Sequence, residues 1–162
     1  MMDSGMGPCV WSTPSSSPQD RQVSMKRILF DINVVLEVLL NRKPHAEASA
    51  AVWAAVETGM AEGLLAAHAM TTIHYLVRKE SGAAKARTIV AAILKVFSIA
   101  AVEGALIEEA LQLSCPDFED AVTAAAARRA RCDYIVTRDP KGLRGSPVRI
   151  LTPEMAIPIC TI

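Results

Sequence analysis

Residues 26–40 read KRILFDINVVLEVLL, and this stretch decides the fold. A short apolar run, 28–30, stops sharply at Asp31, which predicts a buried strand. The longer apolar segment 34–40 predicts a helix, with Asn33 available to cap its start. In open α/β sheets, ligands bind beyond the carboxyl ends of the strands. Asp31 would lie at that edge of a central strand, so it is the first candidate for a functional residue.

The chain around this stretch has the composition of an ordinary folded protein. Its 162 residues fit one domain, with 51% hydrophobic, 21% charged and only 4% aromatic residues. Lysine plus arginine and aspartate plus glutamate both total 17, so the chain has no overall basic field. Binding to nucleic acid would therefore need a local basic patch, because affinity for phosphate is largely electrostatic.

The first 24 residues differ from the rest, being rich in Ser, Pro and Gly without a periodic apolar pattern. We expect 1–24 to be a disordered lead that lacks the features of a secretion signal, with Met25 as an alternative translation start. The folded domain would then be 25–162. The four cysteines form no CxxC pair, which favours reduced thiols and a cytoplasmic location. The most apolar long stretch, 83–102, contains three basic residues, so no membrane span is expected.

Helical and strand patterns alternate along the remainder of the chain. Further strands are expected at 64–67, 98–102, 134–137 and 148–151. Helices are expected at 46–59, 70–79, 83–97, 105–113 and 117–131, with a short terminal helix starting at 152–154. This alternation predicts an α/β fold, a three-layer α/β/α sandwich around a central parallel sheet. Right-handed crossovers would place the loops after the first and fourth strands at one edge.

Acidic residues gather at that edge. Asp31 and Asp139 each follow a strand, and Asp117 and Asp120 lie at the start of the helix before the fourth strand. Magnesium and manganese prefer carboxylate and water oxygens, so acids converging from separate elements predict a divalent metal site. Such an ion leaves coordination positions open for a phosphate and activates water for hydrolysis.

Each acid also has a purely structural interpretation. Asp117 follows a proline and suits a helix N-cap, while Asp120 complements the helix dipole. Asp139 before Pro140 suits a turn. The pattern alone leaves both interpretations open for these three, whereas Asp31 at the end of an apolar strand favours function.

Other polar residues carry weaker signals. Glu37 and Glu119 suit solvated helix positions, and His45, His68 and His74 share no metal-ligand spacing, so we expect structural roles for them. Arg138 and Lys141 flank Asp139 and are the candidates for contacts with phosphate.

Three motifs in order, LFDINVVLEVLLNR, DFEDAVTAAAA and CDYIVTRDPKGL…SPVRILTPE, resemble the PIN-domain family, most closely its branch of VapC-type toxins. The resemblance runs from about residue 25 to 158. It implies a three-layer α/β/α nuclease that cuts RNA with Mg²⁺ or Mn²⁺ held by acidic residues. It also implies a small antitoxin protein as partner and a homodimer.

By position, Asp31, Asp120 and Asp139 match the acids of the family motifs, which implies catalytic and metal-binding roles. Asn33 matches the polar companion of the first acid, and Thr137 a hydroxyl that orients ligands or water. Asp117, one turn before Asp120, could reach the metal directly or through water.

One position departs from the family pattern. Many members carry a glutamate on the helix after the second strand, and Thr72 stands at that place here. The leading hypothesis is a metal-dependent ribonuclease toxin. The alternative is a catalytically degraded PIN-like module that binds RNA or a protein without cleavage. A third class, phosphoryl transfer through an aspartyl nucleophile, would need a second aspartate at the place of Asn33 or a lysine after a later strand, for which Lys141 is the only candidate.

Overall fold

The computed structural model describes residues 24–161. The expected lead at 1–24 therefore lies, apart from Ser24, outside the described residues. Five strands form one sheet: β1 (Lys26–Phe30), β2 (Ala61–Ala66), β3 (Ser98–Ala100), β4 (Tyr134–Val136) and β5 (Arg149–Leu151). The helices of the described chain are α1 (Ile32–Leu39), α2 (Ala46–Glu57), α3 (Ala67–Ser81), α4 (Ala83–Val96), α5 (Gly104–Leu111), α6 (Phe118–Arg129) and α7 (Pro153–Cys160).

All strand pairs are parallel, and the strands lie in the order β3-β2-β1-β4-β5. The chain therefore builds outward from β1 to β2 and β3, then returns to the other side of β1 for β4 and β5. This reversal makes the carboxyl ends of β1 and β4 the topological switch point of the sheet. Open α/β sheets bind ligands at this point.

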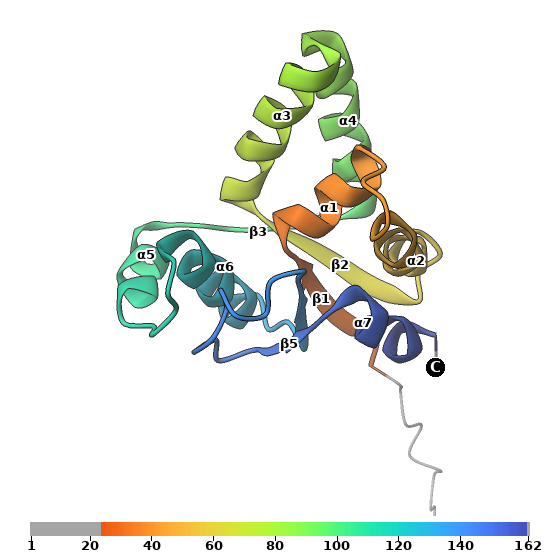
Figure 1. Ribbon diagram of the computed structural model, residues 1–162. Helices are drawn as coiled ribbons and strands as arrows, with labels where there is room; N and C mark the ends of the chain where they lie inside the picture. The colour runs from red at the N-terminus through yellow and green to blue at the C-terminus, as the bar shows by residue number, and fades with distance from the viewer. Residues whose placement is uncertain (1–23, 162) are drawn as a thin grey trace, which may run out of the picture.

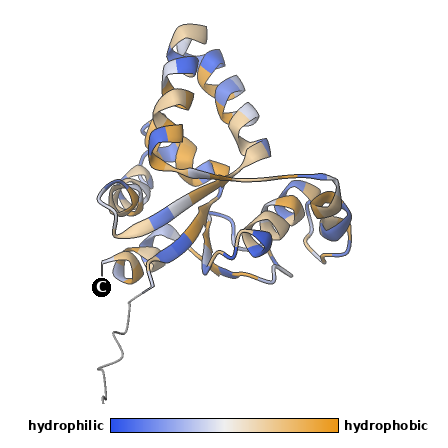
Figure 2. Cartoon of the chain, turned by 180° about the vertical axis from the view of Figure 1, so that it is seen from behind, coloured by the Kyte–Doolittle hydropathy of each residue, from blue (hydrophilic) through white to orange (hydrophobic). Residues whose placement is uncertain are grey.

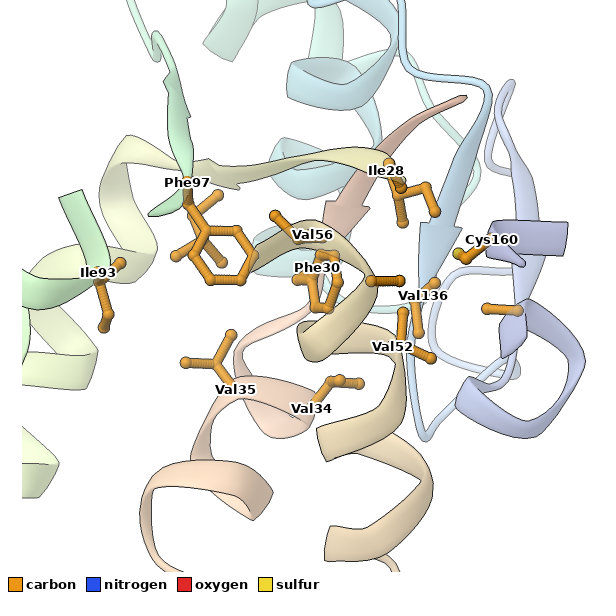
Figure 3. Close-up of a cluster of buried hydrophobic side chains, with 14 of the residues drawn as sticks. Ile28, Phe30, Val34, Val35, Val52, Val56, Ile93, Phe97, Val136 and Cys160 are labelled. Atoms are coloured by element: carbon orange, nitrogen blue, oxygen red, sulfur yellow. The ribbon is translucent and has the colours of Figure 1, made fainter. Parts of the chain in front are cut away.

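Strand β1 shows why the sheet is covered on both faces. Ile28 and Phe30 point to one core, and Leu29 points to the other, because side chains alternate across a strand. All three are almost fully buried. The first core also contains Phe97, labelled beside Phe30 in Figure 3. The two rings pack edge-to-face with centroids 5.1 Å apart.

The helices divide between the two faces. Helices α1, α2, α3, α4 and α7 supply the first core, while α5 and α6 supply the second. In Figure 1, α3 and α4 rise from the body as an antiparallel arm, and α5 and α6 lie side by side on the opposite side of the sheet. Hydrophilic and hydrophobic residues alternate along that arm (Figure 2). The expected three-layer α/β/α fold is confirmed.

The middle of helix α6 is built from small, buried side chains. The residues from Ala121 to Ala127 are all buried, and five of these seven are alanines. Small side chains allow α6 to lie close to both the sheet and α5. Its first turn is thereby held near the carboxyl end of β1.

The structure corrects two element boundaries and one cap. Strand β2 occupies Ala61–Ala66, earlier than the expected 64–67, and α3 starts at Ala67 instead of residue 70. Alanine and glycine carry little strand signal, so the start of β2 was not visible in the sequence. Asn33 lies inside α1, and Asp31 takes the N-cap position without a side-chain capping bond. Within residues 24–161, no helix is both long and apolar enough to cross a bilayer.

Candidate metal and nucleic-acid site

Asp31 is held at the switch point by strand β4. Its backbone N–H donates to the carbonyl of Val136 at 2.9 Å, and its carboxylate Oδ2 accepts a hydrogen bond from the hydroxyl of Thr137 at 2.8 Å. The Asp31 carboxylate therefore bonds to Thr137, and it forms no capping hydrogen bond at the start of α1. Asp31 is 8% exposed and Thr137 is 1% exposed, so this carboxylate is fixed in place.

Thr137 also connects Asp31 to Asp139. The backbone N–H of Asp139 donates to Thr137 Oγ1 at 3.0 Å, while the hydroxyl hydrogen of Thr137 goes to Asp31. Asp139 Oδ1 accepts from the backbone N–H of Gly142 at 3.3 Å, so the turn role considered for Asp139 is present. The side chain of Asp139 remains exposed.

Asp139 and Asp120 both lie next to Gly142. A Cβ atom at position 142 would lie 2.5 Å from Asp120 Oδ2 and 3.1 Å from Asp139 Oδ2. The two carboxylates thus converge on the space that a side chain at 142 would fill. Asp120 comes from the first turn of α6, whose N-cap is Asp117, with Asp117 Oδ1 accepting from the N–H groups of Glu119 at 2.8 Å and Asp120 at 3.4 Å.

A cleft of about 340 Å³ opens beside these acids. Its polar lining comes from β1, α1, α3 and α6: Asp31, Asn33, His68, Thr72, Asp117, Glu119, Asp120 and Thr123. No lysine or arginine is among the lining residues in the described part of the chain. The negative charge of the cleft is therefore not balanced by the protein.

The pKa values of Asp31 and Asp120 are raised by their burial and by the acidic side chains around them. Burial, followed by repulsion from Asp31, Asp117, Asp139 and Glu119, raises the pKa of Asp120 to about 6. Burial also raises the pKa of Asp31, against the opposing effect of the Thr137 hydrogen bond. For both of these carboxyls, repulsion from neighbouring acids adds to the effect of burial on the pKa, and a bound cation would offset it.

Sequence reasoning missed two residues of the site. His68 was expected to be structural but lines the cleft with Asp31, and Glu119, which is exposed as expected, lines the same cleft. Burial lowers the pKa of His68, despite the nearby charges of Glu119 and Asp31, so its ring is neutral at neutral pH. The available signal for His68 was its place just after β2, at the same sheet edge as Asp31.

Arg138 lies in a different place from the one expected. Its guanidinium donates to Glu37 Oε2 at 2.9 Å and to Glu154 Oε1 at 2.6 Å, and it also donates to the carbonyl of His45. The Arg138 side chain is 16% exposed and that of Glu37 10%. Arg138 therefore ties the end of β4 to α1, α2 and α7, and the expected phosphate contact is not supported. Glu37 is likewise buried, not solvated.

Lys141 remains the basic candidate next to Asp139. It is exposed, and it forms no ion pair within residues 24–161. Asn33 is exposed at the cleft, and Thr72 lines it from α3.

The donor set fits a hard divalent cation, since several carboxylates converge on a cleft without a counter-charge. The ligands are not preassembled, however. Among residues 24–161, no three His, Cys, Asp or Glu side chains already surround one point as metal ligands. A bound ion would draw the carboxylates of Asp120 and Asp139 toward the fixed carboxylate of Asp31 by side-chain rotation.

Comparison with known proteins adds independent information. The family model described as "PIN domain" matches residues 27–141. A comparison with curated protein sequences gives no match.

Several solved structures share the fold. FitAcB from Neisseria gonorrhoeae has a TM-score of 0.60 at 20% identity, covering 78% of this chain and 97% of that chain. A toxin–antitoxin complex from Klebsiella pneumoniae has a TM-score of 0.59 at 18% identity, with 78% and 97% covered. VapBC2 from Rickettsia felis, bound to a DNA fragment from its promoter, has a TM-score of 0.62 at 12% identity, with 78% and 98% covered.

Proposed function

The chain belongs to the PIN-domain family, and from this we propose that it is a Mg²⁺- or Mn²⁺-dependent endoribonuclease, the toxin of a toxin–antitoxin pair. The observation that carries the proposal is the convergence of Asp31, Asp120 and Asp139 at the switch point of the sheet. Burial and the neighbouring charges raise the pKa of Asp120 to about 6, and no basic side chain of the described residues lines the cleft to offset them.

In this proposal the acids have distinct roles. Asp31 is fixed by Thr137, Asp139 is placed by Thr137 and Gly142, and Asp120 is placed by the capped first turn of α6. When bound, the cation supplies charge stabilisation to the scissile phosphate and lowers the pKa of water. Asp117 supports the site both as N-cap of α6 and as a carboxylate that lines the cleft with Asp31 and Asp120. Lys141 contacts the phosphate backbone of the RNA beside Asp139.

We propose a cytoplasmic antitoxin protein and a second copy of this chain as partners. Support comes from the toxin–antitoxin complex that shares the fold and from exposed apolar side chains on the arm. Tyr75 on α3 is 63% exposed and Leu94 on α4 is 55% exposed. Light scattering on the purified chain, alone and co-expressed with the protein encoded next to it, tests both partnerships.

The activity itself is tested by cleavage of structured RNAs in Mn²⁺, comparing wild type with Asp31→Asn. We expect cleavage that EDTA stops and that Asp31→Asn reduces by about a hundredfold to a thousandfold, as for loss of a central electrostatic group. Asp133→Asn is the matched control, since Asp133 lies at the opposite end of the sheet, where its Oδ2 accepts from the Arg27 N–H at 2.9 Å, a bond the amide oxygen can keep. Cleavage by Asp31→Asn at the wild-type rate would contradict the proposal.

A second candidate is the degraded module that binds RNA or a protein without cutting. Two observations favour it: Thr72 in place of a carboxylate, and the lack of a preassembled set of three ligands within residues 24–161. Salt-sensitive RNA binding without any cleavage in Mn²⁺ would select this candidate over the nuclease.

A further inference from the structure

His68 lies in the wall of the cleft that α3 forms. On this wall Thr72 stands where many family members carry a glutamate, so a carboxylate ligand is missing. His68 lies in the first turn of α3, directly after β2, and Thr72 follows one helical turn later. Both residues line the cleft opposite Asp31 and the α6 acids. Residues four apart lie on the same face of a helix, so His68 and Thr72 present adjacent side chains to one space.

The hydrogen bonds around His68 define its two ring nitrogens. Nε2 lies 3.5 Å from Thr123 Oγ1, and the Thr123 hydroxyl donates its own hydrogen to the carbonyl of Glu119 at 3.0 Å. Thr123 Oγ1 can therefore only accept from His68. This assigns the ring proton to Nε2 and leaves a lone pair on Nδ1.

The Nδ1 atom is buried and has no partner. Within residues 24–161 it is the only buried side-chain nitrogen or oxygen that lacks a hydrogen bond. A buried acceptor without a donor costs about 1–3 kcal/mol, so a histidine that served packing alone would be a poor choice here. Metal-bound histidines show this same arrangement, with one nitrogen on the metal and the other N–H on a protein oxygen.

We infer that His68 supplies a nitrogen ligand to the divalent cation of this site, in place of the carboxylate that Thr72 lacks. The inference rests on the proposed function and deepens it by assigning metal preference. Imidazole nitrogen suits transition metals, whereas Mg²⁺ prefers oxygen ligands alone. The site should therefore favour Mn²⁺ over Mg²⁺. The His68 ring turns toward the ion in the same side-chain closure that draws in the carboxylates.

Electron spin-echo spectroscopy of bound Mn²⁺ tests this directly, because nitrogen ligation gives a ¹⁴N modulation that oxygen ligation does not. Tag-free wild type should show the modulation, and His68→Ala should lose it. His74→Ala is the matched control, since His74 is on the same helix but lies against Arg87 and Leu94, outside the cleft. By calorimetry, His68→Ala should bind Mn²⁺ at least roughly tenfold more weakly, while its Mg²⁺ affinity changes far less.

His68→Glu separates ligation from folding. It keeps a ligand but replaces nitrogen with oxygen, so it should bind Mn²⁺ without the ¹⁴N signal and bind Mg²⁺ more tightly than wild type does. Wild type that binds Mn²⁺ with no ¹⁴N modulation would overturn the role of His68 and leave the proposed nuclease intact. Wild type that binds no Mn²⁺ would overturn both.

Discussion

At the scale of single residues, the sequence revealed the carboxylates but not everything around them. Asp31 was visible because an acid at the end of an apolar strand has no ordinary structural reason. The capping role of Asp117 and the turn role of Asp139 are confirmed by their hydrogen bonds, while the metal-binding roles of these acids stay predictions. The places of His68 and the exposed Glu119 at the cleft were missed because they depend on neighbours that lie far away in the sequence.

Gly142 gives a test of the space between two of the acids. An alanine there would place its Cβ 2.5 Å from Asp120 Oδ2 and 3.1 Å from Asp139 Oδ2. Gly142→Ala should therefore force the two carboxylates apart and weaken Mn²⁺ binding at least roughly tenfold, as for other losses around a metal site. Gly104→Ala is the control, because within residues 24–161 no atom beyond the adjoining backbone lies within 4 Å of the place that its new methyl group would take. Equal Mn²⁺ affinities of the two variants by calorimetry would mean that Asp120 and Asp139 do not share an ion.

Asp120 gives a prediction for the dependence of stability on pH. Its pKa of about 6 in the folded chain lies above the ordinary value, so the folded state binds more protons than the unfolded state between about pH 4 and 6. Stability at this site therefore falls as pH rises through that range, and the loss is complete above about pH 6.

Removing the charge of Asp120 should restore the stability that is lost as the pH rises from about 4 to 6. In EDTA at pH 7, Asp120→Asn should increase the free energy of unfolding by about 1 kcal/mol after allowance for solvent screening, and the gain should vanish toward pH 4. Urea denaturation at several pH values measures this. A variant less stable than wild type at pH 7 would show that Asp120 is not repelled by its neighbours.

At the scale of secondary structure elements, the interpretation of Arg138 was wrong for a specific reason. Its main partner, Glu37, lies 101 positions away in α1, and the local sequence around either residue does not predict that the two form an ion pair. The pair closes only when α1, α2 and α7 pack on the same face of the sheet. By contrast, the order of helices and strands was predictable, because it depends on local apolar patterns.

The Glu37–Arg138 pair should contribute strongly to stability. Both side chains are at most 16% exposed, so removing Glu37 leaves Arg138 with Glu154 as its remaining ion-pair partner and costs about 1.5–3 kcal/mol, as for loss of a hydrogen bond to a charged group. Glu37→Gln should lower the free energy of unfolding by about that amount. Glu62→Gln breaks the Arg27 pair, whose side chains are 33% and 37% exposed, and should cost less than about 1 kcal/mol. Similar losses of unfolding free energy in the two variants, measured by urea denaturation, would show that the Glu37 pair stabilises the fold no more than a surface ion pair does.

At the scale of the whole molecule, the strand order explains why the acids meet. Asp31 follows β1 and Thr137 follows β4, and these strands are neighbours only because the chain reverses direction across the sheet. The sequence predicted the shared edge through the handedness of crossovers. It could not predict the side-chain geometry within that edge, including the partnerless His68 nitrogen.

The central claim is that this edge holds a divalent cation through Asp31. Calorimetric titration of Mn²⁺ into metal-free wild type, Asp31→Asn and Asp133→Asn at pH 7 tests it most directly. Wild type and Asp133→Asn should bind Mn²⁺ saturably, and Asp31→Asn should bind it at least roughly tenfold more weakly. No binding by wild type at millimolar Mn²⁺, or equal affinity in all three proteins, would contradict it.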